Sequence, residues 1–425
     1  MRQRVHQDIF FISSLFLAFF LPVFPKFLPP IIAVSIINWI ISGIYLTTVP
    51  KIFTEKRRLC TLSFALIYLG YLAGMLYTTD FTYGWFDLQV KLSLFIFPVI
   101  FATSNYPVFN KRQVQYILGA FVTGCIAGSL ILLGHSLLVN ERWGVPDPFY
   151  YTNLTWYFHA SYLAMYNTFA VGIVLYHLPV IFTRQSAYKT ISLSLAVVYL
   201  QAFIFLLSSK AGLITLGFTE ILFVVLLIVK KAGIPRIVFI SVIMITLFAL
   251  FSQIFPYAFG RVSKADAMVA RSETLQKNPN DGTVQRKEIW KVSMGLVGKH
   301  FLFGTGTGDV KDVLMEAYQQ HGLYPVYQKK LNAHNQYIQT FLALGIPGIS
   351  VLLIMLLLPA YGSLRKKEYL YLLFLLIFAF NILFESMFET QAGVIFYAFF
   401  NVFLFSGSFS PTGGNAAGWF DRCSC

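Results

Sequence analysis

Charged residues are scarce in this sequence, and the scarcity excludes most classes of protein. Asp, Glu, Lys and Arg make up 12% of the 425 residues, whereas soluble globular chains average about 25%. Hydrophobic residues reach 57%, with 44 Phe and 24 Tyr, which is more apolar surface than a water-soluble core of this size can bury. The composition excludes a soluble enzyme, a disordered scaffold and a fibrous protein, and it indicates an integral membrane protein.

Cysteine and acidic residues are also few. The four cysteines, Cys60, Cys125, Cys423 and Cys425, form no CxxC pair and no metal-ligand spacing, so we expect neither a disulfide framework nor a zinc site. Only 18 residues are acidic, against 32 basic ones. In a membrane protein the positions of the basic residues matter more than their sum, so the formal charge of +14 does not indicate nucleic acid as a partner.

Long hydrophobic runs, by contrast, are abundant. A spanning helix needs roughly 20 apolar residues. The first run follows Met-Arg-Gln-Arg without a small-residue cleavage site after it, so we interpret it as a spanning helix and not as a signal peptide. The predicted fold is an all-α integral membrane protein with about twelve transmembrane helices. The runs cover residues 9–27, 29–48, 59–77, 91–105, 114–138, 159–182, 190–207, 211–229, 237–256, 337–360, 369–384 and 391–407.

The positions of Lys and Arg predict the orientation of these helices. If the N-terminus is cytoplasmic, the short inner segments hold 17 basic residues and the short outer segments hold four, which is the asymmetry expected of membrane proteins. The four outer residues are Lys26, Lys91, Arg142 and Lys210. The predicted order is transmembrane helices 1–9 over 1–256, a long periplasmic loop over 257–336, helices 10–12 over 337–410 and a cytoplasmic tail over 411–425.

The long loop carries predicted helices of its own. Thr283–Lys299 has the pattern of an amphipathic helix, because apolar residues such as Ile289 and Trp290 recur among charged ones. Asp309–Gln320 is predicted to be a second helix. The glycine-rich stretch Gly304–Gly308 between them lacks the Gly-Lys-Ser/Thr ending of a phosphate-binding loop, so we interpret it as a tight turn. Loops of this length with their own helices are usually functional.

The clearest motif lies where this loop re-enters the membrane. His334-Asn335 is followed after nine residues by Gly345 and after two more by Gly348. His334 is expected at the first turn of a spanning helix, at the outer membrane surface, and an imidazole accepts a proton near neutral pH. Asn335 beside it is suited to orient a polar substrate group. The alternative is an interfacial histidine at a helix start, with the glycines used for packing.

This motif resembles the signature of the O-antigen ligase family, which includes O-antigen polymerases and some protein O-oligosaccharyltransferases. The number of spans and the long loop before the motif are similar as well. The resemblance implies a C-type glycosyltransferase-like fold in a bacterial inner membrane. It also implies transfer of a glycan from undecaprenyl pyrophosphate to an acceptor hydroxyl on the periplasmic face, with inversion and without cofactor, nucleotide sugar or metal. In this family His334 would be the catalytic base or its equivalent.

The family also pairs two basic residues with the pyrophosphate of the donor. In the sequence Ser-Ser-Lys-Ala-Gly, Lys210 stands where the family has an arginine, and it keeps the charge without the bidentate fork of a guanidinium. Arg286, a few residues before a tryptophan, is the expected second cation, and Arg261 and Arg271 are weaker candidates. The alternatives are a Lys210 that snorkels to the interface and an Arg286 that is solvated or lies on headgroups.

Other polar residues lie near the predicted outer ends of spans. His159 and Tyr162 are candidates for substrate contact, with anchoring in the aromatic belt as the alternative. Glu385 and Glu389, in the last outer loop, are candidates for binding acceptor hydroxyls or for positioning His334, and a solvated turn is equally compatible with the sequence.

The expected partners are the lipid-linked glycan donor, a lipid A-core acceptor and membrane lipids. The His-Asn pair and the single long loop favour a ligase over a polymerase, whose acceptor would be another lipid-linked repeat unit. A secondary transporter is the competing function from another class, and Glu220 in the middle of a predicted span is the feature in its favour. A non-catalytic scaffold in envelope assembly is the third reading, and it predicts that His334 is dispensable.

Overall fold

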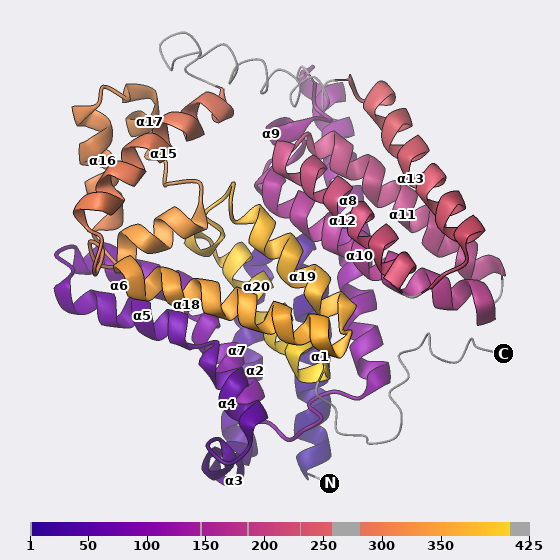
Figure 1. Ribbon diagram of the computed structural model, residues 1–425, viewed down its shortest axis with the longest axis horizontal. Coiled ribbons are helices and arrows are strands. Elements are labelled where there is room, and N and C mark those ends of the chain that lie inside the picture. Colours follow the sequence, from indigo (N-terminus) through magenta and orange to yellow (C-terminus); the bar gives the residue numbers. More distant parts are fainter. Residues whose placement is uncertain (1, 145–146, 185–186, 230, 257–280, 409–425) are drawn as a thin grey trace.

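The protein is helical throughout the part that the structure describes. The computed structural model describes residues 2–144, 147–184, 187–229, 231–256 and 281–408, and these ranges contain helices and connections but no strand (Figure 1). The all-α class predicted from the sequence is confirmed. Arg261 and Arg271, and the predicted tail 411–425, lie outside the described residues.

The helices differ widely in length. Those of the first half are α1 (Arg2–Val23), α2 (Leu28–Ser42), α3 (Ile44–Thr48), α4 (Lys56–Ser63), α5 (Leu66–Gly74), α6 (Phe81–Lys91), α7 (Ser93–Ala102), α8 (Lys111–Trp143), α9 (Tyr151–Leu154), α10 (Ala160–Arg184) and α11 (Ala187–Leu207). Those of the second half are α12 (Lys210–Val229), α13 (Ile234–Ile254), α15 (Gly282–Lys299), α16 (Val310–Gln320), α17 (Tyr324–Gln328), α18 (Gln336–Lys366), α19 (Tyr369–Asn381) and α20 (Gln391–Ser408). The short 3-10 helices are η1 (Pro25–Phe27), η2 (Val49–Lys51), η3 (Met75–Tyr77) and η4 (Met387–Glu389).

All twelve predicted runs lie on helices, but fewer helices qualify as spans. By length and composition, seven described helices are long and apolar enough to cross a membrane, or up to nine if each of two bent pairs counts as one span. The bent pairs, α4 with α5–η3 and α6 with α7, each change direction by 41°. At 1.5 Å per residue the 13 residues of α19 reach only about 20 Å, short of a hydrocarbon core of about 30 Å.

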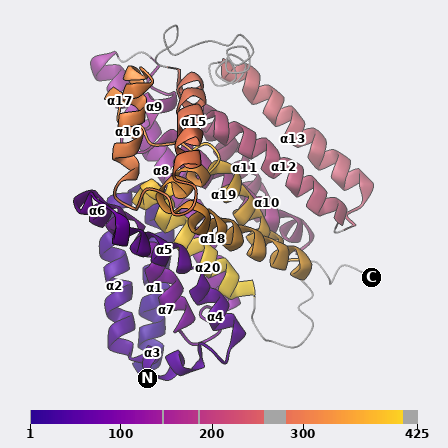
Figure 2. The same cartoon turned by 60° about the vertical axis from the view of Figure 1, so that its left-hand side comes forward.

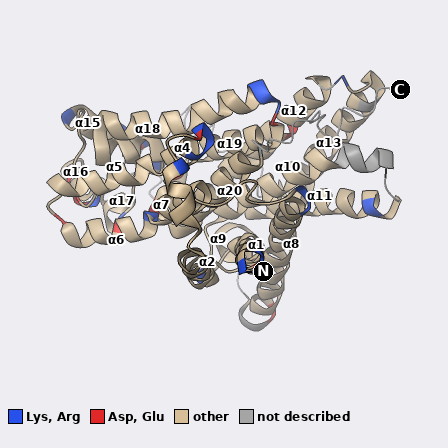
Figure 3. Ribbon diagram, turned by 90° about the horizontal axis from the view of Figure 1, so that it is seen from below, with Lys and Arg blue, Asp and Glu red and all other residues tan. Residues whose placement is uncertain are grey.

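The helix surface has the character that lipid requires. On α13 the side chains of Val238, Phe239 and Ile245 are 54–69% exposed, and Figure 3 shows how few positions along the helices are charged. An apolar surface of this extent is stable only in a lipid environment. Lys91, which was counted among the basic residues of the short outer segments, ends α6 and is fully buried.

Helices from the two halves of the chain pack together. α1 packs along α8 and α2, α20 packs on α7, and α18 packs on both α19 and α5 (Figures 1 and 2). Both helices predicted in the long loop are confirmed, as α15 and α16. The carboxylate of Asp309, just before α16, accepts hydrogen bonds from the backbone N–H groups of Thr79 (2.8 Å) and Asp80 (2.7 Å), which ties this region to the start of α6.

The helix that follows the motif, α18, breaks at Gly345. Gly345 has φ 61° and ψ −149°, a region that is open in practice only to glycine. The segment Phe301–Gly306 packs into the break, and its backbone forms hydrogen bonds of 2.7–3.2 Å with Leu342, Ala343 and Ile346. The polar backbone groups that the break frees are therefore paired, as they must be near a membrane.

The break changes the place of His334 relative to the membrane. The sequence predicted His334 at the first turn of a spanning helix, but a separate helical segment, residues 336–344, lies between His334 and the break (Figure 1). Residues 346–366 alone reach about 30 Å at 1.5 Å per residue, which is enough to cross the hydrocarbon core. The motif histidine thus precedes a short helix that leads to the span.

The glycine-rich stretch Gly304–Gly308 is a turn that docks on other helices. A Cβ atom at Gly304 would lie 2.5 Å from the backbone of Ala343, and one at Gly306 would lie 2.6 Å from Oγ1 of Thr78. The N–H of Gly308 donates to the same Thr78 oxygen (2.9 Å). Since these backbone groups are already engaged, the geometry agrees with the turn interpretation and not with a phosphate cradle.

Candidate functional site

His334 lies in the connection between α17 and α18 and has a left-handed backbone. Its φ is 46°, a conformation that is uncommon outside glycine and persists only where the surroundings hold it. Oδ1 of Asn332 accepts a hydrogen bond from the N–H of His334 (3.0 Å), and Nε1 of Trp290 donates to the carbonyl of Ala333 (3.0 Å). These bonds fix the connection at Ala333 and His334, and the His334 side chain remains 21% exposed.

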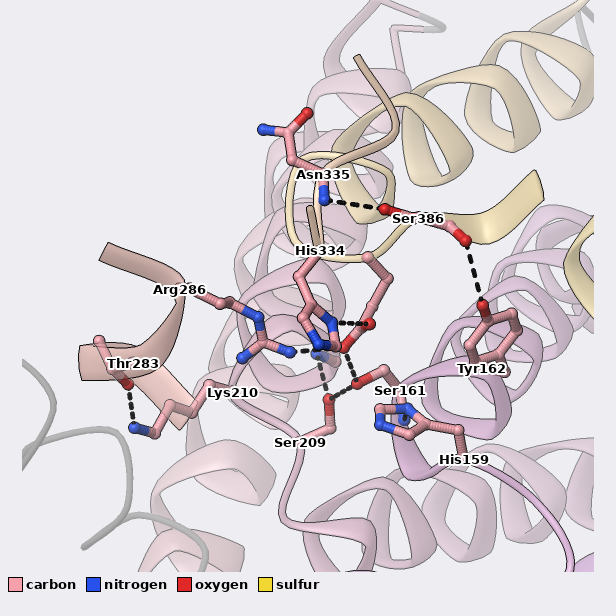
Figure 4. A network of polar contacts seen from close by, with 12 residues as sticks. His159, Ser161, Tyr162, Ser209, Lys210, Thr283, Arg286, His334, Asn335 and Ser386 are labelled. Carbon is pink, nitrogen blue, oxygen red and sulfur yellow. Dashed lines mark hydrogen bonds and ion pairs between the residues drawn. The ribbon is translucent and has the colours of Figure 1, made fainter. Parts of the chain in front are cut away.

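Asn335 acts as the N-cap of α18. Its Oδ1 accepts hydrogen bonds from the N–H groups of Tyr337 (2.9 Å) and Ile338 (3.2 Å), as capping residues do. Its own N–H donates to Oγ of Ser386 (3.1 Å). The side chain lies apart from the His334 ring in Figure 4, so its clearest task here is structural, and contact with a substrate stays a prediction.

Glu385 joins the groups of the site. Nδ1 of His334 lies 3.0 Å from Oε2 of Glu385, while Nη2 of Arg286 donates to Oε1 at 2.6 Å and Oγ of Ser161 donates to the same oxygen at 3.1 Å. Glu385 itself is only 4% exposed. The three partners come from the connection before α18, from α15 and from α10, so one buried carboxylate holds together segments that are far apart in the sequence (Figure 4).

The surroundings keep Glu385 ionised. Burial on its own would raise the pKa of this carboxyl, but the hydrogen bond from His334 and the positive charge of Arg286 outweigh burial and lower its pKa to about 2. An ionised carboxylate only accepts hydrogen bonds, so Nδ1 of His334 carries the proton of their contact. Nε2 of the neutral ring is therefore left as a proton acceptor.

Arg286 and Lys210 approach the site from two helices. Lys210 is the first residue of α12, and its Nζ donates to Oγ1 of Thr283 at 2.5 Å. Thr283 and Arg286 are three residues apart on α15, so they share one helix face. The side chains of Lys210 and Arg286 are 21% and 24% exposed, and Figure 4 shows both to one side of His334. The structure thus brings the predicted base, His334, close to the two predicted cations that it describes, Lys210 and Arg286.

One donor of Arg286 is available for a further ligand, and an acidic residue lies near Lys210. Nε of Arg286 is buried and has no hydrogen-bond partner among the described residues, which is rare for a buried donor. Asp281 lies 3.9 Å from Nζ of Lys210. Burial on its own would raise the pKa of Asp281, but the N–H of Val284, the charge of Lys210 and the N–H of Thr283 lower it overall. Asp281 therefore stays ionised at neutral pH.

His159 and Tyr162 border the same centre. The hydroxyl of Tyr162 donates to the carbonyl of Ser386 (3.5 Å), and Nδ1 of His159 accepts from the N–H of Ser161 (3.3 Å). Tyr162 is buried and His159 is exposed. The charge of Glu385 acts on both side chains, so both lie near it.

Four hydroxyl groups that connect the site were not predicted from the sequence. Ser209 donates to Ser161 (3.3 Å), which in turn donates to Glu385, so the residue before Lys210 is linked to the carboxylate. Thr283 and Ser386 make the further contacts described above. Small hydroxyl residues are common at helix ends, so the sequence holds no signal that would have set these four apart. Only their convergence in space marks them.

Two predicted carboxyl residues lie elsewhere. Glu389 contacts Nζ of Lys91 (3.1 Å) and not His334. Glu220, in α12, is buried and accepts a hydrogen bond from Nε2 of Gln201 on α11 (2.5 Å). A carboxyl hydrogen-bonded to the neighbouring helix is the structural alternative that the sequence left open for Glu220.

The assembled groups are suited to acid–base chemistry beside an anion. They provide an imidazole with a buried carboxylate on one nitrogen, together with a guanidinium and an ammonium on one side. In the described part of the chain, no three His, Cys, Asp or Glu side chains form a group that could hold a metal ion.

Comparison with known proteins relates part of this chain to a family. Residues 195–353 match the sequence model described as Wzy_C, O-antigen ligase. The matched region includes Lys210, Arg286 and His334, whereas Glu385 lies beyond it. No curated protein matches the chain. The resemblance inferred from the His-Asn motif is therefore confirmed over the matched residues, and the members of this family are glycan-transferring enzymes of the ligase or polymerase type.

Proposed function

We propose, from the membership of residues 195–353 in the O-antigen ligase family, that this multi-pass helical membrane protein is a ligase. It moves a glycan from undecaprenyl pyrophosphate to a hydroxyl of lipid A-core oligosaccharide on the periplasmic face of a bacterial inner membrane. The observation that supports this proposal most is the contact of His334 and Arg286 with one buried carboxylate, Glu385. That contact joins a base to an anion-binding group in one site.

His334 is the proposed base. Its Nδ1–H is held by Glu385, so Nε2 is available to take the proton of the acceptor hydroxyl as that oxygen attacks. The carboxylate also stabilises the imidazolium that forms. A positioned general base of this kind contributes a factor of about 10²–10⁴ in rate.

Arg286 and Lys210 are the proposed ligands of the pyrophosphate. As the glycosidic bond breaks, negative charge develops on the leaving oxygen, and fixed cations in a site of low dielectric constant stabilise it. The buried Nε of Arg286 without a partner among the described groups supports this role. Lys210 supplies a compact charge in place of a bidentate fork, and Thr283 holds it next to Arg286.

The proposed reaction is a single displacement. The acceptor oxygen forms a bond to the anomeric carbon while the bond from that carbon to the pyrophosphate oxygen breaks. The proton of the acceptor passes to Nε2 of His334, and undecaprenyl pyrophosphate leaves with the electron pair. Direct attack from the opposite face inverts the anomeric centre. The positive charge that the leaving group requires comes from Arg286 and Lys210, so the proposed step uses no metal ion.

The membrane setting is part of the proposal. Seventeen basic residues in the short inner segments against four in the outer ones support cytoplasmic termini. The site then lies on the periplasmic side, where α15 to α17 belong to the loop 257–336, between helices 1–9 (1–256) and helices 10–12 (337–410). A C-type glycosyltransferase-like arrangement follows from the family. The polyprenyl tail stays in lipid while the glycan extends into water.

Replacement of His334 tests the proposal directly. We expect His334→Ala to lower kcat by about 10²–10⁴-fold because the base is lost, without a change in membrane level. The measurement is transfer from lipid-linked glycan to lipid A-core by purified protein, without added nucleotide. His321→Ala is the matched control, since that ring bonds only to the carbonyl of Ala317 (2.8 Å) among its described contacts. Unchanged transfer by His334→Ala would overturn the proposed role.

The acceptor separates the ligase from its closest alternative. An O-antigen polymerase would use the same donor chemistry and extend a lipid-linked repeat unit instead. Supplying the purified protein with both acceptors distinguishes them, because longer chains on the lipid carrier indicate a polymerase and glycan on lipid A-core indicates a ligase. The more distant alternative is a secondary transporter, for which Glu220 would matter. The family match favours transfer, and movement of a glycan across vesicles without covalent transfer would favour transport.

A further inference from the structure

A second buried ionic cluster lies beside the site, and the proposed mechanism does not use it. Lys91 is 0% exposed, and its ammonium bonds to Asp87, one turn earlier on α6, and to Glu389 at 3.1 Å. The ammonium also lies 4.7 Å from the ring centroid of Tyr71. Taking a lysine and two carboxyl groups out of water is costly even when they are paired, so the cluster needs an explanation beyond packing.

Glu389 belongs to the connection that carries Glu385. This connection, residues 382–390, joins α19 to α20 and is not a regular α-helix. Met387 and Phe388, between the two glutamates, are fully buried. Apart from the three residues of η4, this connection has no helical backbone to fix its side chains, so contacts with other elements must position Glu385. Glu389 supplies one such contact through Lys91.

A second set of contacts links the same cluster to the same connection. The hydroxyl of Tyr71, next to Lys91, lies 3.1 Å from Oγ1 of Thr340, which accepts a hydrogen bond from Nε2 of Gln336 (3.0 Å). Oε1 of Gln336 accepts one from the N–H of Phe388 (2.7 Å). The Lys91 cluster therefore reaches the connection twice, at Glu389 directly and at Phe388 through the first helical segment of α18.

We propose that Lys91, with Asp87 and Glu389, is a positioning group that fixes the connection 382–390 so that Glu385 faces His334 and Arg286. This inference rests on the proposed function of that pair. Lys91 does not touch the substrate in this account. Lys91 holds Glu389, and Glu389 in turn helps to position the carboxylate of Glu385, four residues earlier in the chain. A lysine buried on α6, outside the family-matched residues 195–353, thereby becomes part of the machinery for glycan transfer.

A double-mutant cycle tests the inference. We expect Lys91→Met to lower kcat by about tenfold or more in the wild-type background, yet by less than about twofold in a Glu385→Gln background, because residues that act as one unit are not additive. Equal losses in both backgrounds would show an independent, purely structural role and would overturn the inference. So would a Lys91→Met enzyme with wild-type kcat.

The pH dependence of kcat distinguishes positioning of Glu385 by Lys91 from a purely structural role of Lys91, because a structural role would not shift it. If Lys91→Met displaces the carboxylate from the imidazole, the acid limb of kcat shifts to lower pH, as it does for Glu385→Gln. The charged and titratable groups facing Glu385 are His334, Arg286 and His159, and all are retained in Lys91→Met. An unshifted limb in a Lys91→Met enzyme of reduced activity would contradict the inference, because a smaller folded fraction lowers the rate without changing the profile.

Two further variants keep the test decisive. Glu389→Gln leaves Lys91 paired with Asp87 and provides the same cycle if Lys91→Met fails to fold. Lys311→Met is the matched control, since its ammonium also lies over a tyrosine ring, that of Tyr83 at 4.9 Å, and we expect its kcat to match the wild type. If Glu385→Gln itself leaves transfer unchanged, the proposed role of Glu385 has failed. That outcome differs from equal losses of kcat for Lys91→Met in the two backgrounds, which would overturn only the role of Lys91.

Discussion

At the scale of single residues, the ionisation of Glu385 decides how His334 works. The hydrogen bond from His334 and the charge of Arg286 overcome the effect of burial and lower the pKa of this carboxyl to about 2, from an ordinary value of 4.5. Since a depressed pKa means that the charged form is favoured in the folded protein, its stabilisation is fully present above about pH 4.5 and is lost as the pH falls towards 2. Glu385 therefore stays charged throughout the range in which an imidazole titrates.

The pH dependence of transfer follows from this charge. Any loss of kcat between about pH 7 and pH 5 does not come from protonation of Glu385, because the pKa of that carboxyl is about 2. In Glu385→Gln the imidazolium loses its anionic partner and becomes a stronger acid, so we expect the acid limb of kcat to move to lower pH while the maximum rate falls. The measurement is kcat from pH 5 to 8 for both enzymes. A limb at the same pH in both would contradict this assignment.

The sequence predicted which charged residues lie close together better than it predicted the contacts between them. His334 was a candidate from its motif, Arg286 and Lys210 were candidates from the family resemblance, and the structure brings the three together. Glu385 and Glu389 were equal candidates, because the sequence does not show which side of a non-helical connection each carboxyl faces. The structure separates them, with Glu385 on His334 and Glu389 on Lys91.

At the scale of secondary-structure elements, α18 shows where a hydropathy pattern fails. The residues on both sides of Gly345 are apolar, so the pattern indicated one continuous span. The break depends instead on backbone groups of Phe301–Gly306, which come from a distant part of the chain and pair with α18. The local periodicity of apolar residues does not indicate a pairing between such distant segments. The helices α15 and α16 were predicted well because their amphipathic pattern and first-turn residues are local signals.

The break in α18 gives a test with an internal control. A Cβ atom at Gly345 would lie against the carbonyl group of Leu302, and the backbone there has φ 61°. We expect Gly345→Ala to destabilise the protein by roughly 1–3 kcal/mol and to reduce transfer, since the segment before the break begins beside His334. Gly362 on the same helix has open space around it, so Gly362→Ala should be neutral or stabilise by up to about 1 kcal/mol.

Thermal unfolding in detergent measures both glycine variants. A lower midpoint for Gly345→Ala together with an unchanged or higher one for Gly362→Ala supports the break as a specific requirement. Equal midpoints for the two variants would show that α18 tolerates an ordinary helical residue at position 345. The role of Phe301–Gly306 in pairing with the opened backbone would then have to be abandoned.

At the scale of the whole molecule, the sequence predicted the all-α membrane class correctly. It overestimated how many of the helices are long and straight enough to span a membrane. All twelve apolar runs lie on helices, but two of them belong to pairs bent by 41° and the 13-residue α19 is shorter than a bilayer core. Bends and short helices are tolerated within a membrane where neighbouring helices cover the freed polar groups. A hydropathy pattern counts apolar residues only. It does not detect neighbouring helices that pair with the freed polar groups. The family match and the apolar surface agree on a multi-pass membrane protein.

The orientation of this molecule in the membrane can be tested by labelling. The distribution of basic residues predicts cytoplasmic termini and a periplasmic α16. In a background without the four native cysteines, we expect Gln319→Cys, an exposed position near the end of α16, to react with a membrane-impermeant maleimide in intact spheroplasts. Arg4→Cys, exposed at the start of α1, should react only after permeabilisation. The reverse pattern would place His334 on the cytoplasmic side of the membrane. His334 could not then reach lipid A-core on the periplasmic face, and the proposed acceptor would be wrong.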